Sequence, residues 1–341
     1  MEMNTSISIS DLDQILDYSR SSFMSLNNAN ILISGASGFV GTWLTSSLLY
    51  ASNKMDLDVQ ITVLVRDQKK LLNRLQEVPK SLKLVEIDYL KKPEIKLKPN
   101  YSHIIQSTTP SMPNSGSIDQ ENVSNVSYQS NEFLLNFAKK HKVAPIFCHL
   151  SSGAVYGNPE KLVGPIEEHV ISNHEISLSN YGMVKKSLER DIEDATYRGD
   201  IRGCNPRLFA FGGPFLQLDA HFAIGNFMQN AILNQPISIN GDPSTIRSYL
   251  YPTDLISFLL ALLNKPTLDP IHIGSNRSVT MLELAALFSN LFKLPIEVNT
   301  KPQSVFSSYF PSTTKSEKYL GVEQKISIEE SLLRWSKWLR N

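Results

Sequence analysis

The residues best suited to chemistry are Tyr181 and Lys185, which stand four apart in a segment of helical apolar spacing that continues through Leu188 and Ile192. On a helix these two side chains share one face, one turn apart. A phenol with a pKa of about 10 carries protons poorly at neutral pH. A nearby ammonium and a positively charged nicotinamide ring both stabilise the phenolate and lower that pKa. The spacing therefore predicts a tyrosine acid/base beside a nicotinamide cofactor, whose ribose Lys185 can also hold.

A serine hydroxyl can complete this set. Residues 145–150 form an apolar, strand-like run, and Ser151 and Ser152 follow it directly. At the carboxyl end of a parallel strand, such a hydroxyl lies at the cofactor site. It can hydrogen-bond the substrate oxygen that becomes, or ceases to be, a carbonyl. Since a tyrosine and a lysine at this spacing also occur on ordinary helix surfaces, the prediction depends on the serine and on a cofactor site earlier in the chain.

That cofactor site is predicted at residues 31–43. An apolar run meets a turn whose glycines, Gly35, Gly38 and Gly41, are spaced G-x-x-G-x-x-G, and helical periodicity follows. In such a strand-turn-helix the first glycine lets the chain reverse, the second lets backbone approach a pyrophosphate, and the third lets the helix pack on the strand. The phosphates then lie on the free N–H groups of the helix. This context favours a dinucleotide site over a purely structural turn.

The elements that must position these groups alternate between strands and helices. We predict strands at residues 59–65, 84–88, 103–106 and 145–150, with a helix at residues 122–140. Such alternation is typical of parallel strands joined by right-handed crossovers, with the cofactor at their carboxyl ends. The predicted fold class is α/β, a Rossmann-type doubly wound parallel sheet with a smaller C-terminal substrate-binding lobe.

The length of the chain suits one large α/β unit with added parts. A helix is expected at residues 10–25, where Ser10 and Asp13 resemble a capping box. We expect three parts: an N-terminal helical extension (1–28), an NAD(P)-binding Rossmann domain that includes the Tyr/Lys helix (29–205), and a mainly substrate-binding lobe with some segments returning to the Rossmann core (206–341).

The end of the second predicted strand indicates which dinucleotide binds. A carboxylate there holds the ribose 2′-hydroxyl of NAD, whereas an arginine accommodates the 2′-phosphate of NADP. The strand ends in apolar Val65, followed by Arg66 and Asp67. This order favours NADP, with two alternatives: Arg66 only extends along the surface, or Asp67 turns back to the ribose.

Composition restricts the classes of partner. The 341-residue chain is 41% hydrophobic and 19% charged, with 33 Lys and Arg against 33 Asp and Glu. Without net charge, no bulk field attracts nucleic acid or an anionic membrane, so the expected partner is a small molecule. The N-terminus does not resemble a secretory signal, and no apolar run approaches the ~18 residues that span a bilayer. We therefore expect a soluble cytoplasmic protein, with Cys148 and Cys204 as buried free thiols and no metal site.

The sequence resembles the extended short-chain dehydrogenase/reductase superfamily, in its NAD-dependent epimerase/dehydratase branch that acts on nucleotide sugars. The segments GASGFVG, SSGAVYG and YGMVK carry the resemblance, which extends over residues 30–335. It implies that Ser152, and not its neighbour Ser151, joins Tyr181 and Lys185 in catalysis, and that Asn125 supports the site from a helix. Its implied cofactor contacts, with Asp88 at the adenine, are Gly35, Ser37, Gly38, Phe39, Val40, Gly41, Arg66, Asp88, Tyr89, Ser107, Thr108, Tyr181 and Lys185.

The C-terminal half is expected to bind substrate. Arg247 lies in the segment RSYLYPTD, which resembles the family's segment whose arginine reaches a sugar-nucleotide diphosphate. The alternative for Arg247 is a structural salt bridge to Asp242 or Asp254. Tyr251 and Asp254 are expected to be structural, and His221 to be either a substrate contact or a packing residue. The implied substrate contacts are Thr109, Ser152, His221, Asn226 and Arg247.

Two positions after the serine narrow the reaction. Sugar 4,6-dehydratases of this superfamily carry an Asp-Glu pair there and decarboxylating members a Glu, whereas this chain has Gly153 and Ala154. Neither side chain moves a proton, so both reactions are disfavoured. We expect a nucleotide-sugar oxidoreductase that reduces a keto-sugar at C4, with a 4-epimerase as the alternative and a non-catalytic NADP-binding module as a third class. The resemblance also implies polysaccharide biosynthesis and a homodimer formed through residues 122–140 and 180–197.

Overall fold

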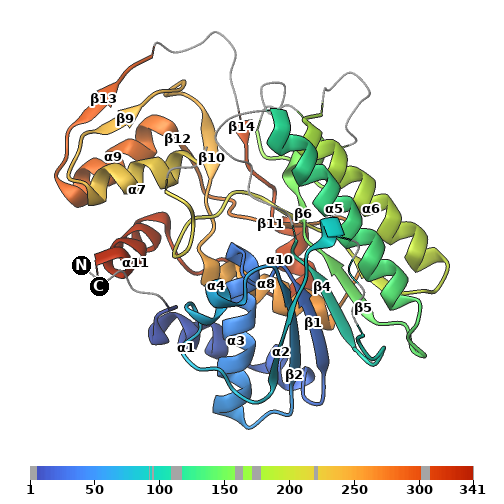
Figure 1. The fold of residues 1–341 in the computed structure, drawn as a ribbon. Helices are drawn as coiled ribbons and strands as arrows, with labels where there is room; N and C mark the ends of the chain where they lie inside the picture. Colours follow the sequence, from blue (N-terminus) through green and yellow to red (C-terminus); the bar gives the residue numbers. More distant parts are fainter. Residues whose placement is uncertain are drawn as a thin grey trace.

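A parallel sheet lies at the centre of the molecule (Figure 1). The computed structural model describes residues 6–91, 93, 96–108, 117–157, 164–170, 178–218, 222–300 and 308–340. The sheet has six strands in the order β3-β2-β1-β4-β5-β7, and each neighbouring pair is parallel. Its strands are β1 (Asn30–Ser34), β2 (Gln60–Val65), β3 (Leu82–Glu86), β4 (His103–Gln106), β5 (Ile146–His149) and β7 (Arg202–Cys204). The order reverses between β1 and β4, the kind of switch point at which α/β sheets bind ligands.

Helices cover both faces of this sheet. The described helices of the Rossmann half are α1 (Ile9–Tyr18), α2 (Arg20–Ser25), α3 (Phe39–Met55), α4 (Gln68–Leu72), α5 (Ser117–Ala138) and α6 (Asn180–Tyr197), and those of the C-terminal half are α7 (Ala223–Ile232), α8 (Pro252–Asn264), α9 (Met281–Phe292), α10 (Thr314–Leu320) and α11 (Ile328–Arg340). Among the residues described, none of these helices is long and apolar enough to cross a bilayer. The Rossmann-type fold class predicted from the strand-helix alternation is confirmed.

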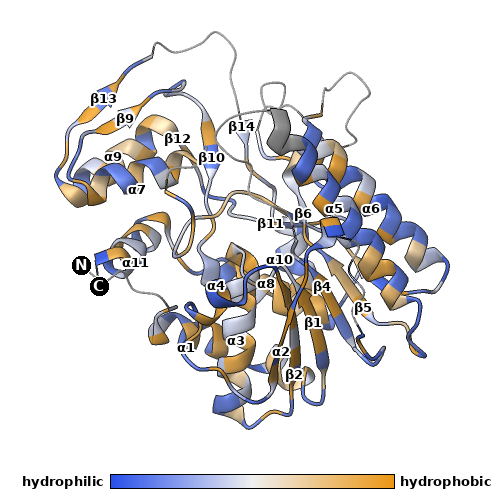
Figure 2. Cartoon of the chain, in the orientation of Figure 1, coloured by the Kyte–Doolittle hydropathy of each residue, from blue (hydrophilic) through white to orange (hydrophobic). Residues whose placement is uncertain are grey.

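Alternate residues of the central strands enter two different cores, as a strand's period of two requires. In β1, Ile31 and Ile33 pack with residues of α1, α3 and α8, whereas Leu32 packs with residues of α5 and α6. In Figure 1, α5 and α6 lie on one side of the sheet and α1 and α3 on the other. Because both faces of β1, β2, β4 and β5 are buried, these strands are rich in hydrophobic residues, as Figure 2 shows.

Most predicted boundaries are close to those observed. The predicted third strand lies two residues too far along, because Asp88 leaves the sheet and caps the short 3₁₀ helix η1 (Tyr89–Lys91), accepting a hydrogen bond from Leu90 N at 3.1 Å. The capping box at Ser10 and Asp13 is wrong. The helix begins earlier, with Ser8 accepting from Asp11 N at 3.2 Å, and it breaks at Ser19 into α1 and α2.

The two cysteines lie on neighbouring strands. Cys148 of β5 and Cys204 of β7 stand opposite one another in the parallel register, and both thiols are buried and free. The prediction of buried free thiols is confirmed, but their adjacency is a product of the sheet order and could not be read from their spacing.

The C-terminal part adds small sheets and a separate helical core. Its strands, with β6 from the end of the Rossmann half, are β6 (Ser151–Ser152), β8 (Pro206–Leu208), β9 (Ile237–Ile239), β10 (Ile246–Ser248), β11 (Ile271–Ile273), β12 (Ser278–Thr280), β13 (Ile296–Val298) and β14 (Ser308–Tyr309). They pair in the orders β12-β10-β14, β11-β8-β6 and β13-β9. Phe227 of α7, Phe288 of α9 and Trp335 of α11 belong to the core of this region, which is the expected place of the substrate lobe.

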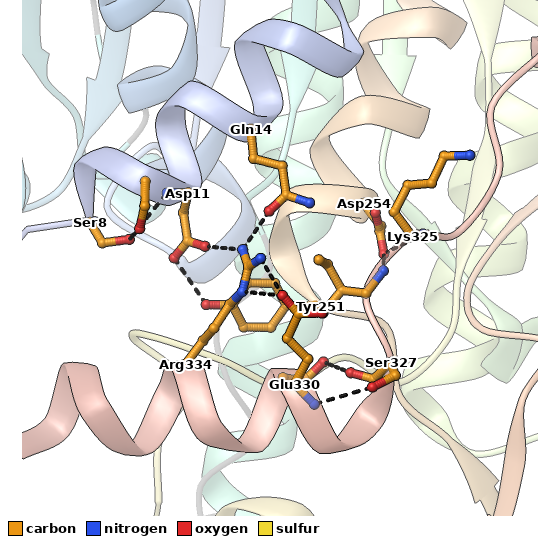
Figure 3. Close-up of polar contacts among 12 residues, drawn as sticks. Ser8, Asp11, Gln14, Tyr251, Asp254, Lys325, Ser327, Glu330 and Arg334 are labelled. Carbon is orange, nitrogen blue, oxygen red and sulfur yellow. Dashed lines mark hydrogen bonds and ion pairs between the residues drawn. The ribbon is translucent and has the colours of Figure 1, made fainter.

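The N-terminal helix is tied to the C-terminal helix by buried polar contacts (Figure 3). Asp11 of α1 accepts hydrogen bonds from Tyr251 Oη at 3.0 Å and from Arg334 Nη1 at 2.8 Å. Arg334 also bonds Gln14 of α1 and Glu330 of α11. Tyr251 lies three residues after β10, the strand that carries Arg247. These contacts therefore connect α1 and α11 to the end of that strand.

Candidate active site

The glycine turn between β1 and α3 is packed so tightly that side chains are excluded. Gly35 has φ +72°, and a Cβ on it would lie 2.7 Å from the backbone of Ser107. A Cβ on Gly41 would lie 2.4 Å from the Gly35 carbonyl oxygen, so this glycine lets α3 rest on the turn. Gly38 is the N-cap of α3, whose first N–H groups are therefore available to an anion. The turn fits the pyrophosphate of a dinucleotide.

The predicted cofactor residues around this turn come from three strand ends. Ser107 and Thr108 follow β4, and Thr108 Oγ1 donates to Ser34 Oγ of β1 at 2.8 Å. Tyr89 is buried after β3, and burial raises the pKa of its phenol. Phe39, the first residue of α3, stacks on Phe211 with ring centroids 4.6 Å apart, which connects the turn to the substrate half.

The residues after β2 form a group of cations. Arg66 is exposed, and the pKa of Lys70 is lowered by burial and by the charges of Arg74 and Arg66. Arg74 Nη1 donates to the carbonyl of Ser37, within the glycine turn, at 2.8 Å. Asp67 is the N-cap of α4 and accepts from Lys70 N at 3.1 Å. The carboxylate nearest the strand end is therefore engaged in capping, and the charge presented beside it is positive.

Ser152, Tyr181 and Lys185 meet at the carboxyl end of the central sheet. Ser152 ends β6, and its Oγ accepts a hydrogen bond from Ala154 N at 3.2 Å. Burial raises the pKa of Tyr181, and a side-chain hydrogen bond with Ser152 acts in the opposite direction. Lys185 Nζ lies 5.9 Å from the centroid of the Tyr181 ring and donates to the carbonyl of Leu150 at 2.6 Å. The structure thus brings the three predicted residues together.

Burial changes the titration of Lys185 strongly. Its side chain is enclosed between α6 and the sheet, which lowers the pKa of the ammonium to about 7, while the negative charge of Glu189 acts to raise it. A lysine in this range changes its charge near neutral pH. The phenol and the amine are thus coupled in a site that water reaches poorly.

The neighbouring serine has a different role. Ser151 Oγ donates to Glu189 Oε1 at 2.5 Å, and Glu189 is held by Arg207. Arg207 Nη1 also donates to Tyr156 Oη at 2.7 Å, and Tyr156 lies 2.6 Å from His272 Nε2. This buried polar network connects α6, which carries Tyr181 and Lys185, to β6, β8 and β11.

Tyr309 is a site residue that the sequence did not reveal. Its side chain hydrogen-bonds Ser152, and burial raises the pKa of its phenol. A Cβ on Gly153 would lie 2.5 Å from Tyr309 Oη and 2.7 Å from the Phe209 ring. No spacing or turn signal marks Tyr309, because it belongs to the two-residue strand β14, whose pairing with β10 is made only in the folded chain.

The predicted substrate residues are placed unevenly. Arg247 lies half-buried on β10, with its guanidinium 5.9 Å from the centroid of Tyr309, so it reaches the site through that ring. Asn226 is exposed on α7. Thr109 and His221 lie outside the described residues. Asn125 is exposed on α5, and its supporting role stays a prediction; Ser127 and Ser130 are buried on the same helix.

Tyr251 and Asp254 are structural, as predicted. Tyr251 donates to Asp11, and Asp254 Oδ2 accepts from the backbone N–H groups of Lys325 and Ile326 at 3.1 and 2.9 Å. Burial raises the pKa of Asp254 to about 6. Within the ranges that the structure describes, no cluster of three or more His, Cys, Asp or Glu residues could hold a metal ion.

Known proteins resemble this chain in sequence. A family model described as the NAD dependent epimerase/dehydratase family matches residues 31–274. UDP-glucuronic acid decarboxylase 1 of Arabidopsis thaliana is 29% identical over 212 residues, which cover 61% of this chain and 48% of that protein. The chain therefore spans about half the length of that relative. UDP-glucuronic acid decarboxylase 1 of Danio rerio is 24% identical over 317 residues, covering 89% of this chain and 70% of that protein.

Solved structures share the fold at lower identity. A UDP-glucose 4-epimerase of Thermotoga maritima, solved with UDP-glucose, superposes with a TM-score of 0.76 at 20% identity, covering 91% of this chain and 98% of that one. A UDP-glucuronic acid 4-epimerase of Bacillus cereus, in complex with NAD, gives 0.75 at 20% identity over 91% and 96% of the two chains. Since the family model matches well over half of the sequence and includes the glycine turn, Ser152, Tyr181 and Lys185, the chain belongs to the NAD dependent epimerase/dehydratase family.

Proposed function

We propose that this protein is an enzyme that transfers hydride between a nicotinamide cofactor and the sugar of a nucleotide sugar, with reduction of a keto-sugar at C4 as its net reaction. The observation that supports this is the meeting of three groups: the Ser152 hydroxyl, the Tyr181 phenol bonded to it, and the Lys185 ammonium beneath the phenol ring. Ser152 is a hydrogen-bond donor for the reacting oxygen, Tyr181 is the proton donor and Lys185 is a cation, and together they suffice for reduction of a carbonyl by a bound cofactor.

Each residue has a defined task in this scheme. The cofactor supplies the hydride. Tyr181 gives its proton to the carbonyl oxygen of the sugar as that oxygen becomes a hydroxyl. Ser152 hydrogen-bonds the same oxygen and holds it near the phenol. Lys185 stabilises the tyrosinate that remains, and a low pKa of the amine near neutrality lets it exchange protons under working conditions.

The residues after Ser152 argue against dehydration and decarboxylation. Gly153 and Ala154 begin the short helix η2 (Gly153–Tyr156) and bring no carboxylate to the site. The curated relatives are named decarboxylases, and the aligned residues are 29% and 24% identical to them. Because elimination or loss of a carboxylate needs acid-base help beyond hydride transfer, the side chains at these two positions favour plain redox chemistry.

We assign NADP as the cofactor on the charge at the end of β2. Arg66, Lys70 and Arg74 supply positive charge there, and Asp67 is occupied as the N-cap of α4. A 2′-phosphate is stabilised by such cations, whereas the ribose 2′-hydroxyl of NAD is held by a carboxylate, and one oxygen of Asp67 is already bonded to Lys70 N. Arg247 is the proposed ligand of the substrate diphosphate.

We also propose that the Rossmann domain spans residues 29–205, between an N-terminal extension and the substrate lobe. We further propose a homodimer through α5 and α6, where Tyr128, Met183 and Tyr197 are exposed.

A 4-epimerase is the second candidate. The solved structures named above as 4-epimerases share this fold, and one of them was solved with NAD. An epimerase would use Tyr181 first as a base and then as an acid. Between the two steps the keto-sugar would rotate so that hydride returns to its other face. The same three residues serve both reactions, so the difference lies in whether the cofactor is released after one transfer.

One experiment separates these proposals. The protein is mixed with NADPH and a set of nucleotide-linked 4-keto-sugars, and NADPH absorbance is followed together with the sugar products. Steady consumption supports the reductase. Conversion between C4 epimers without net consumption supports the epimerase. Cofactor binding without either reaction would show that the protein is a binding module, and our proposal would be rejected.

A further inference from the structure

His149 is a buried histidine next in sequence to the residue whose carbonyl binds Lys185. His149 ends β5, one residue before Leu150, whose carbonyl oxygen accepts the hydrogen bond from Lys185 Nζ. Only 1% of His149 is exposed. Its side chain lies on the same face of the sheet as Phe147, two residues earlier, and α5 and α6 cover that face. The imidazole and the Lys185 side chain therefore enter one enclosed layer between the sheet and α6.

The hydrogen-bond partners of His149 define its tautomer. Ser130 Oγ uses its hydrogen on the carbonyl of Ser127 at 3.0 Å, so it can only accept from the amide of Gln106, at 3.4 Å. The Gln106 amide nitrogen therefore faces Ser130, and its oxygen faces His149 Nδ1 at 3.0 Å. An acceptor at this place requires a hydrogen on Nδ1. The lone pair of the neutral ring is then on Nε2.

That lone pair is buried without a partner. Nε2 is closed off from solvent and has no hydrogen bond to any of the described residues. A buried acceptor without a donor carries a desolvation penalty, so such atoms in native proteins call for an explanation. Burial holds the pKa of the His149 imidazole well below its usual range, and the positive charge of Lys185 lowers it further. The ring therefore stays neutral and keeps its acceptor.

We propose that His149 is a positioning residue for Lys185, and that its Nε2 accepts a hydrogen bond from one water that the Lys185 ammonium holds. The ammonium is then held by the Leu150 carbonyl and, through that water, by His149, with its charge under the Tyr181 ring. The other charges near this layer are Glu189 of α6, which acts on Lys185, and Asp191 of α6, which is bonded to Asn131 of α5. The effect on turnover rests on the proposed function; the hydrogen bond itself does not.

Two amide substitutions test this assignment. In His149→Gln the amide is three bonds from Cβ and replaces Nε2, while in His149→Asn it is two bonds from Cβ and replaces Nδ1. If Nε2 acts on Lys185, the Gln variant keeps kcat near that of the unchanged protein. The Asn variant loses about tenfold in kcat with KM changed less than about twofold, as expected for one hydrogen bond to a charged group. A purely structural role through Gln106 gives the opposite order and overturns the proposal.

A second readout does not need turnover. The ionisation of Tyr181 is followed by ultraviolet difference spectroscopy, with Tyr181→Phe subtracted to isolate its signal. The Asn variant should raise the pKa of Tyr181, because a poorly held ammonium stabilises the phenolate less, and the Gln variant should leave it unchanged. Equal titrations in all three proteins, or a nitrogen-15 spectrum with the His149 hydrogen on Nε2, would refute the proposal. If the protein binds NADPH but reduces no keto-sugar, the proposed function fails, while these two measurements still decide the role of His149.

Discussion

Arg207 donates two hydrogen bonds to Glu189, from Nε to Oε1 at 3.0 Å and from Nη2 to Oε2 at 2.7 Å. Glu189 lies on α6 one turn after Lys185, and Arg207 lies on β8, so the pair fixes α6 to the strand that pairs with Ser152. The side chains are 15% and 6% exposed, which makes this a buried pair.

Replacing one partner of that pair should destabilise the folded protein strongly. Glu189→Gln leaves Arg207 buried with a neutral partner, and the expected loss in the free energy of unfolding is about 3–5 kcal/mol. The exposed pair of Arg198 and Asp200 is the matched control, and Asp200→Asn should change stability by about 1 kcal/mol or less. Denaturant unfolding of both variants measures the difference, and equal losses would mean that burial of the Glu189 pair has no special weight.

Removal of the Tyr181 hydroxyl should stop the proposed chemistry. Tyr181→Phe keeps the ring over Lys185 but has no proton to give, so kcat should fall by at least about 100-fold. NADPH affinity should remain close to that of the unchanged protein. Tyr197, exposed on the same helix, is the control, and Tyr197→Phe should leave the rate unchanged. Turnover that survives in Tyr181→Phe would show that another group moves the proton.

Arg66 should set the preference for NADP. Arg66→Ala removes a cation from the end of β2, and the affinity for NADP should weaken about tenfold, while the affinity for NAD stays the same. Lys69→Ala changes a neighbouring exposed cation and serves as the control. Titration with each dinucleotide, followed by calorimetry, gives both constants. If NAD bound more tightly than NADP before any substitution, the cofactor assignment would be reversed.

The third glycine should be needed for cofactor binding. A methyl group at Gly41 would lie 2.4 Å from the Gly35 carbonyl oxygen, so Gly41→Ala must push α3 away from the turn, at about 1–3 kcal/mol. Dinucleotide affinity should fall with it. Gly241→Ala is the control, because nothing lies near the added methyl. Thermal unfolding and cofactor titration are measured together, and unchanged binding in Gly41→Ala would contradict the assigned role of this turn.

Lys185 should reduce the stability of the protein in a pH-dependent way. Burial lowers the pKa of its ammonium to about 7 in the folded state, against 10.5 unfolded. Between these values the unfolded chain binds more protons than the folded one, so the contribution of Lys185 to stability rises with pH and is lost as pH falls through about 7. Lys185→Met should therefore stabilise the cofactor-free protein most at pH below about 7, and the gain should vanish toward 10.5. Denaturant unfolding across this pH range measures the free energy of unfolding of both proteins. If the difference between them did not change with pH, the Lys185 ammonium would be in contact with water, against this prediction.

Local signals were enough to predict five of the six strands of the central sheet, all except β7, and three of the groups at its end. The glycine turn, the apolar run before Ser152 and the spacing of Tyr181 and Lys185 each report on one strand or one helix, so neighbouring residues determine them. Tyr309 and His149 required contacts between distant segments. Tyr309 reaches Ser152 through strand pairing of β14 with β10, and His149 acquires its partner Gln106 from another strand. No pattern within either segment indicates such a neighbour.

The position after Ser152 limits which reactions this scaffold can acquire. Any side chain at Gly153 would collide with the Tyr309 oxygen and the Phe209 ring, both of which come from the other half of the chain. Room for an acidic group at that point therefore requires smaller residues at both 309 and 209. A lineage that began from this protein would need at least two coordinated changes there, and directed-evolution libraries that vary one codon at a time would not sample them.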